Sequence, residues 1–121
     1  MRISTTFAYE LPAFDAGQYE GCEFCMYSGD ASLLIQVAEL GTISIVFRRV
    51  RWHQFTALPN CTPEMVGGAY FRLVELSSSA VNAFVAADAS NARAYSDLHH
   101  YRIFLDETGC HEVFAESFSV V

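Results

Sequence analysis

The closing stretch of the chain, from His99 to Val121, constrains the fold more than any other segment. Two alternating runs of β-branched and aromatic residues, 99–105 and 110–115, flank the turn sequence Asp-Glu-Thr-Gly at 106–109. A glycine at the last turn position can adopt the positive φ that closes a three-residue hairpin loop with a bulge. The segment therefore predicts an antiparallel β-hairpin.

One face of this hairpin is expected to join the core. If Asp106 lies opposite Cys110, then Ile103 lies opposite Val113 across the ladder. The residues of this face are Tyr101, Ile103, Leu105 and Val113. A shift of the register by one residue would exchange the two faces, so the assignment depends on the turn.

The other face carries the first candidate binding residues, which are His100, Arg102, Glu112 and Glu116. In the same register His100 lies opposite Glu116, and Arg102 reaches Glu112 or Glu116 diagonally. This pattern is typical of a half-solvated strand face whose charges pair across the ladder, each pair contributing about 0.2–1 kcal/mol. A binding face is the alternative.

Upstream, residues 32–39 and 42–55 predict two long strands that form a hairpin around Leu40-Gly41. The apolar residues of the second run change parity at Val50, which predicts a β-bulge and a bend near Arg48-Arg49.

Helical signals are few. Thr62-Pro63 predicts a helix start that Gly67-Gly68 ends within a turn, and residues 80–89 predict the main helix, with a further turn at 91–98. No linker or repeat divides the 121 residues. The sequence thus predicts a single α+β domain, 1–121, with a curved, mostly antiparallel sheet of six to eight strands, one main helix (80–89) and short helical turns.

The net charge of −7 disfavours binding to nucleic acid or to an anionic membrane. No run approaches the about 20 apolar residues of a membrane-spanning helix, and the first residues lack a signal-peptide core, which favours a cytoplasmic location.

All seven basic residues are arginine, a bias that suggests GC-rich coding and a bacterial source. Since 52% of residues are hydrophobic and only 17% are charged, we expect a protein partner or a homodimer to cover part of the surface.

Cys22 and Cys25 have the spacing of zinc knuckles and redox motifs. The pair lies in an apolar strand, where residues three apart point to opposite faces. We therefore expect small core thiols, with structural zinc at Cys22 and Cys25 as the weaker alternative and no other cofactor.

A cluster of arginines adjoins the only tryptophan. Arg48, Arg49, Arg51 and Trp52 supply planar guanidinium and indole groups, which favour an anion pocket or a protein interface. A solvated strand rim is the alternative interpretation.

The sequence contains neither a Gly-x-Ser-x-Gly nucleophile elbow nor a phosphate-binding glycine loop. This favours a non-enzymatic protein, although the absence of a motif leaves catalysis open.

The closing segment, together with the Phe47-x-x-Val50-Arg51 strand and Cys61, resembles a group of small uncharacterised bacterial cytosolic proteins over about the C-terminal two thirds of the chain. The residues that carry the resemblance are His100-Tyr101-x-Ile103-x-x-Asp106-x-x-Gly109-Cys110-x-Glu112-Val113-x-Ala115-Glu116-Ser117. Some proteins of this style resemble immunity factors of contact-dependent toxin systems. The resemblance implies neither a substrate nor catalytic residues.

Two functional hypotheses follow. The first is a non-enzymatic interaction protein, an immunity-like inhibitor or accessory subunit, that presents an acidic surface and aromatic strand faces to a partner. The second is a small ligand-binding or catalytic domain with a pocket against the sheet. That pocket would be lined by Arg51, Trp52, His100, Arg102 and Glu116.

Overall fold

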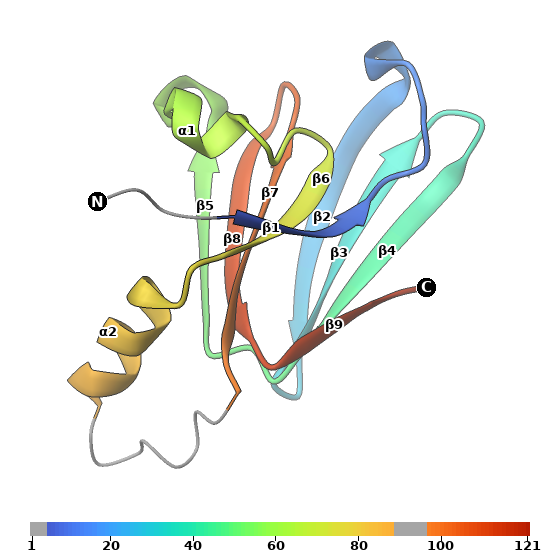
Figure 1. Cartoon of the computed structure of the whole chain (residues 1–121). Helices are drawn as coiled ribbons and strands as arrows, with labels where there is room; N and C mark the ends of the chain where they lie inside the picture. The colour runs from blue at the N-terminus through green and yellow to red at the C-terminus, as the bar shows by residue number, and fades with distance from the viewer. Residues whose placement is uncertain (1–4, 89–96) are drawn as a thin grey trace.

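The computed structural model of the protein describes residues 5–88 and 97–121. Within these residues nine strands form two antiparallel sheets that face each other, and the main helix lies beside the larger sheet (Figure 1). The larger sheet has the order β1-β6-β7-β8-β5, and the smaller one has the order β2-β3-β4-β9. The α+β class agrees with the prediction, but the expected single sheet of six to eight strands is wrong.

The larger sheet consists of β1 (Thr5–Glu10), β6 (Arg72–Leu76), β7 (His99–Leu105), β8 (Gly109–Ala115) and β5 (Trp52–Ala57). The smaller sheet consists of β2 (Tyr19–Tyr27), β3 (Asp30–Val37), β4 (Gly41–Arg48) and β9 (Ser117–Val120). The helical segments are the 3₁₀ turns η1 (Ala16–Gln18) and η2 (Leu58–Asn60) and the helices α1 (Pro63–Val66) and α2 (Ser79–Ala87).

The two sheets arise because the predicted long strand at 42–55 is interrupted. β4 ends at Arg48, Arg49 adopts a φ of 53°, and β5 begins at Trp52 in the other sheet. The change of apolar parity at Val50 therefore marks a crossing between sheets, and the predicted bulge at Arg48-Arg49 is wrong. Val50 is buried in the core at the crossing.

The terminal hairpin forms with a register two residues from the predicted one. Leu105 lies opposite Gly109, and Tyr101 lies opposite Val113, so the loop comprises residues 106–108 and Glu107 takes the positive φ of 65°. Gly109 has the predicted positive φ, at 145°, and it also allows a close approach of β5, since a Cβ there would meet the carbonyl oxygen of Thr56. A shift by an even number of residues preserves the faces, so the predicted core face is correct.

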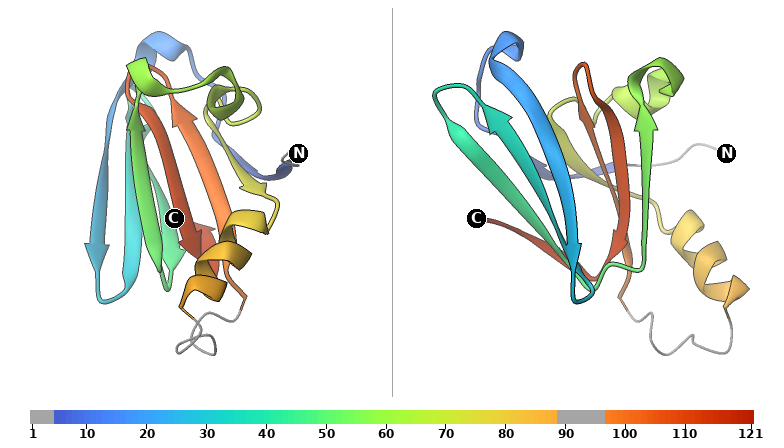
Figure 2. Two further views of the ribbon diagram at one scale, coloured as in Figure 1. Left: turned by 90° about the vertical axis from the view of Figure 1, so that its left-hand side faces the viewer. Right: turned by 180° about the vertical axis from the view of Figure 1, so that it is seen from behind.

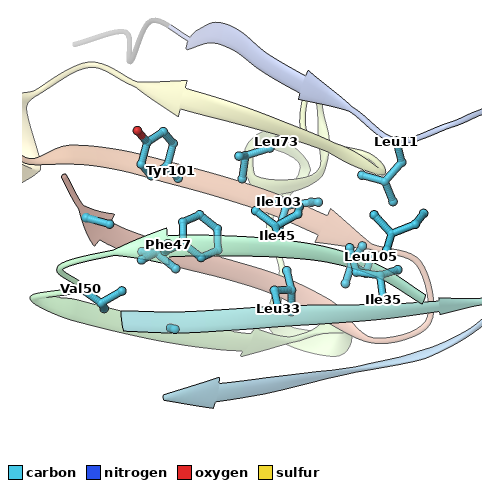
Figure 3. Packing of buried hydrophobic residues seen from close by; sticks show 14 of the residues in the cluster. Leu11, Leu33, Ile35, Ile45, Phe47, Val50, Leu73, Tyr101, Ile103 and Leu105 are labelled. Carbon is cyan, nitrogen blue, oxygen red and sulfur yellow. The ribbon is translucent and has the colours of Figure 1, made fainter. Parts of the chain in front are cut away.

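The main core lies between the two sheets. Leu33, Ile35 and Ile45 of the smaller sheet pack against Ile103 and Leu105 of the larger one, and each is at most 1% exposed (Figure 3). Tyr101 and Val113 are buried in the same cluster, as the hairpin pattern predicts.

Two short helices follow their local sequence signals. Thr62 Oγ1 accepts a hydrogen bond from the Met65 N–H at 3.3 Å, and Gly67 ends the single turn of α1. Helix α2, Ser79–Ala87, starts one residue before the predicted span of 80–89 and ends two residues before the end of that span. The predicted turn at 91–98 falls mostly outside the described residues. Among the helices of the described residues, none has the length and apolar character needed to cross a membrane.

The outer face of the larger sheet is covered rather than half-solvated. Under α1, Phe104 and Cys110 pack with Val66, while Phe114 packs with Val81 of α2. The views in Figure 2 show α1 and α2 over opposite ends of this face. The predicted solvent exposure of the second hairpin face is therefore wrong, because segments distant in sequence lie over it.

Candidate functional site

Three of the predicted polar residues meet on the covered face of the larger sheet. His100 Nε2 lies 2.7 Å from Glu112 Oε1, and Arg102 Nη2 donates to the same oxygen at 3.3 Å. The three side chains are 8%, 7% and 9% exposed for His100, Arg102 and Glu112. We call these residues the buried polar triad.

The register of the hairpin explains the triad. Arg102 lies directly opposite Glu112, and His100 lies diagonally from it, opposite Phe114. The triad sits between the apolar cluster under α1 and the cluster under α2. The predicted pairing of His100 with Glu116 is wrong, because the register shift moves Glu116 beyond the end of β7.

The protonation state of the triad follows from its hydrogen bonds. Burial alone would raise the pKa of Glu112, but the hydrogen bond from His100 and the charge of Arg102 together lower that pKa below its ordinary value. Glu112 is therefore ionised at neutral pH, and His100 Nε2–H must be the donor. Arg102 Nε, also buried, has no hydrogen-bond partner among the described residues.

Outside the triad, Arg102 has a second carboxylate neighbour. Arg102 Nη1 lies 3.8 Å from Glu64 Oε1, a carboxylate of α1 whose side chain is 65% exposed. The polar groups of the triad thus bind mainly one another, which is the arrangement of a structural network.

The other residues of the predicted pocket lie apart or have a packing role. Trp52 packs on Phe114 with ring centroids 4.3 Å apart and meets His100 edge-on at 6.3 Å. Glu116 Oε2 instead binds Arg49 Nε at 2.7 Å. Arg51 lines a separate concavity, so the five residues do not converge on one pocket.

The arginine cluster lies where β4 crosses to β5. Arg48 binds Asp30 at 3.0 Å and Arg49 binds Glu116 at 2.7 Å, both as solvated ion pairs. Arg49 and Arg51 line a concavity of about 160 Å³ together with Ser28, Gly29 and Val50. Because exposed pairs contribute about 0–1 kcal/mol, these contacts shape the loop more than they stabilise the fold.

Cys22 and Cys25 lie on opposite sides of β2, as their spacing predicts. Cys22 packs against the main core, whereas Cys25 pairs opposite Ser32 on the outer side. The two thiols do not converge on a common point.

A carboxylate-rich end of the molecule is a feature that sequence reasoning missed. Its carboxylates are Glu10, Asp15, Glu20, Glu39, Glu64, Asp106 and Glu107, of which all except Asp106 are exposed. They lie in the turns 38–40 and 106–108, in the segment 10–20 and on α1, which Figure 1 shows together at one end of the sheets. We call this region the acidic end.

Hydrogen bonds join these segments. The Ala38 N–H donates to the Gln18 carbonyl at 2.8 Å, which ties the β3–β4 turn to η1. Tyr19 Oη lies 2.6 Å from Thr108 Oγ1, and the Leu58 N–H donates to the Thr108 carbonyl at 3.1 Å. These bonds connect three of the four stretches of the acidic end, and η2, which precedes α1 in the chain, is bound to the turn at 106–108.

Positive charge is concentrated elsewhere. Of the described arginines, Arg48, Arg49 and Arg51 lie at the opposite ends of the strands, beside the β2–β3 turn. The other two described arginines each contact one carboxylate of the acidic end, since Arg72 lies 3.6 Å from Glu10 and the buried Arg102 lies 3.8 Å from Glu64. The charge of the described residues is therefore asymmetric along the strand direction.

Exposed apolar side chains adjoin the carboxylates. Leu40 is 48% exposed, Leu58 38% and Tyr70 46%, and the Tyr70 hydroxyl donates to Asp106 Oδ2 at 3.0 Å. Two shallow concavities of about 370 and 190 Å³ share Glu10 and Tyr70 in their linings. The acidic end thus combines negative charge with apolar contact area. Turn positions of the carboxylates were visible in the sequence, but their meeting at one end was not.

The fold and these surfaces define a two-sheet α+β protein whose most distinctive surface is an acidic, partly apolar end. Comparison with protein-family models, curated proteins and solved structures found no match.

Proposed function

We propose that this chain is an interaction protein that binds a lysine- and arginine-rich surface of another protein through its acidic end. The observation that carries the proposal is the gathering of seven carboxylates from separate turns beside exposed Leu40, Leu58 and Tyr70. Charge of one sign steers an oppositely charged partner during encounter, and partly exposed apolar side chains supply contact area after it.

Charge also selects the class of partner. A net charge of −7 repels nucleic acid and anionic lipid, so a basic protein is the favoured partner. A second copy would bring two acidic ends together, so any homodimer uses another face. An inhibitor of the immunity type is the form of this function that the sequence resemblance favours.

The arrangement of the polar triad supports this proposal over a ligand-binding or catalytic domain. His100, Arg102 and Glu112 are buried and bind one another. Arg51 and Glu116, the other charged members of the expected pocket, lie outside the triad at the crossing from β4 to β5, where Arg51 lines a concavity with Arg49 and Glu116 binds Arg49.

The test combines cross-linking with charge-neutral variants. The full chain is incubated with lysate of its native host, and cross-linked peptides are mapped by mass spectrometry. We expect cross-links at the acidic end. Their yield should decrease as the salt concentration rises, and it should be at least tenfold lower in the variant D106N/E107Q.

The double variant E23Q/D97N is the matched control, because it removes two exposed carboxylates outside the acidic end. Cross-links confined to the outer face of the smaller sheet, or equal losses in the two double variants, would contradict the proposal.

A further inference from the structure

Two histidines meet at the side of the molecule where the edge strands β2 and β5 approach each other. His53 Nε2 lies 3.2 Å from His111 Nδ1, and the two rings are nearly parallel at 15°. Phe24 of β2 stacks on His53 with ring centroids 3.7 Å apart. Cys22 Sγ, also on β2, lies 3.6 Å from His111 Nε2.

We infer that the His53–His111 pair is a pH-sensitive contact between β5 and β2. It holds the two strands together while one proton bridges the two rings, and it releases them when acid protonates both rings.

The hydrogen bond requires an unprotonated ring nitrogen. In an N–H···N bond between imidazoles one nitrogen donates and the other accepts, whereas two imidazolium rings have only donors. Double protonation would therefore replace the bond by two N–H groups and two positive charges at a separation of 3.2 Å.

Burial makes this charging costly. His111 is 6% exposed, and burial, followed by the charge of His53, lowers the pKa of His111 to about 4. Burial also lowers the pKa of His53. Both shifts agree with the geometry, because the neutral rings fill an apolar gap between the sheets.

The groups that face the pair do not offset a positive charge. From β2, Cys22 presents a thiol whose pKa is raised by burial, so it stays neutral, and Phe24 presents a ring. The Phe55 ring of β5 lies 4.8 Å from His111 between centroids. Ile103 of β7 lies opposite His111.

Carboxylates of the same strands point away. Glu112 projects from the opposite face of the larger sheet, beside the neutral amide of Gln54, and Glu23 lies on the outer face of β2. Among the described residues, no carboxylate forms an ion pair with His53 or His111. Tyr19, the nearest further titratable group on β2, has its hydroxyl at Thr108 and a pKa raised by burial.

No ladder of backbone hydrogen bonds joins β2 to β5, because they are edge strands of different sheets. Ring contacts, the Cys22 thiol and the Tyr19–Thr108 hydrogen bond join β2 to the larger sheet. Separation would expose the Phe24 ring and remove the support of the two edge strands, which would then fray from β3 and β8 while the inner strands stay paired. Such an opening differs from global acid unfolding, in which all strands lose protection together.

The experiment follows hydrogen exchange of the full chain by mass spectrometry at pH 7.0 to 4.5, after correction for the intrinsic exchange rate. We expect exchange in peptides covering 19–27 and 52–57 to rise at least tenfold on acidification, while the peptide covering 99–105, the inner strand β7, stays protected. In parallel, NMR titration of the histidine ring protons should show two histidines that titrate well below 6.5.

The variant H53F retains a stacking ring and removes one of the two basic groups, so the acid-induced rise should be clearly smaller in it, with the remainder due to the buried His111. H99N is the matched control, because His99 binds Glu75 at 2.7 Å outside this contact, and it should behave as the wild type. An equal acid response in H53F, a uniform rise in all strands, or titration of His53 and His111 at the ordinary histidine pKa would overturn the inference. The wild-type NMR titration decides the matter if H53F fails to fold.

Discussion

Replacing Glu112 with alanine removes the carboxylate that accepts hydrogen bonds from both His100 and Arg102. The guanidinium of Arg102, whose side chain is 7% exposed, would then lie beneath α1 with Glu64 as its nearest carboxylate. Glu64 is 3.8 Å away and largely solvated, so its compensation is weak. Loss of one partner from a buried ion pair costs about 3–5 kcal/mol, and we expect a loss of this size.

Equilibrium unfolding in urea at pH 7 measures this loss. A decrease of about 3–5 kcal/mol is a large share of the about 5–15 kcal/mol by which typical domains are stable. Glu116→Ala is the matched control, since its partner Arg49 is 58% exposed and the pair should contribute at most about 1 kcal/mol.

A second variant separates an unpaired charge from lost packing. Arg102→Met combined with Glu112→Leu removes both charges and keeps apolar volume, so it should recover most of the stability that Glu112→Ala loses. If Glu112→Ala costs no more than Glu116→Ala, the buried polar triad does not stabilise the fold in the way proposed.

Three further outcomes are expected. Gly109→Ala should destabilise by on the order of 2 kcal/mol in urea unfolding, because its φ is 145° and its Cβ would meet the Thr56 carbonyl; a neutral effect would contradict this packing. Leu33→Ala in the core should cost about 2–5 kcal/mol, whereas Leu40→Ala at the acidic end should change stability by at most about 0.5 kcal/mol; similar losses would refute the assignment of the core. The lowered pKa of Glu112 contributes stability that is present above the ordinary carboxyl pKa of 4.5 and is lost as the pH falls through the folded value. Unfolding of the wild type and of Glu112→Gln between pH 6 and 3 checks this, and identical pH dependence would contradict it.

Local sequence signals correctly located several elements. The Thr62-Pro63 start and the Gly67 end of α1 depend on capping within one turn, so neighbouring residues suffice to predict them. The hairpin at 99–115 is also local, and its alternation placed Tyr101 and Ile103 in the core even though the register differs by two residues.

Exposure of the second hairpin face could not be read from the same alternation. His100, Arg102 and Glu112 are polar, which is typical of a solvated face, yet they are buried because α1 and α2 cover the sheet. The covering helices α1 and α2 lie outside the hairpin in sequence, and alternation within the hairpin reports only which residues share a face.

By itself, the sequence determined where most of the strands and turns form, which residues of the terminal hairpin share a face, and that the charge is strongly negative. Only the tertiary structure decided that the chain crosses to a second sheet after Arg48, that four turn regions gather their carboxylates at one end, and that His53 meets His111. The physical reason is the range of the forces involved. Turn and cap preferences act between adjacent residues, whereas sheet packing joins segments that no local pattern relates.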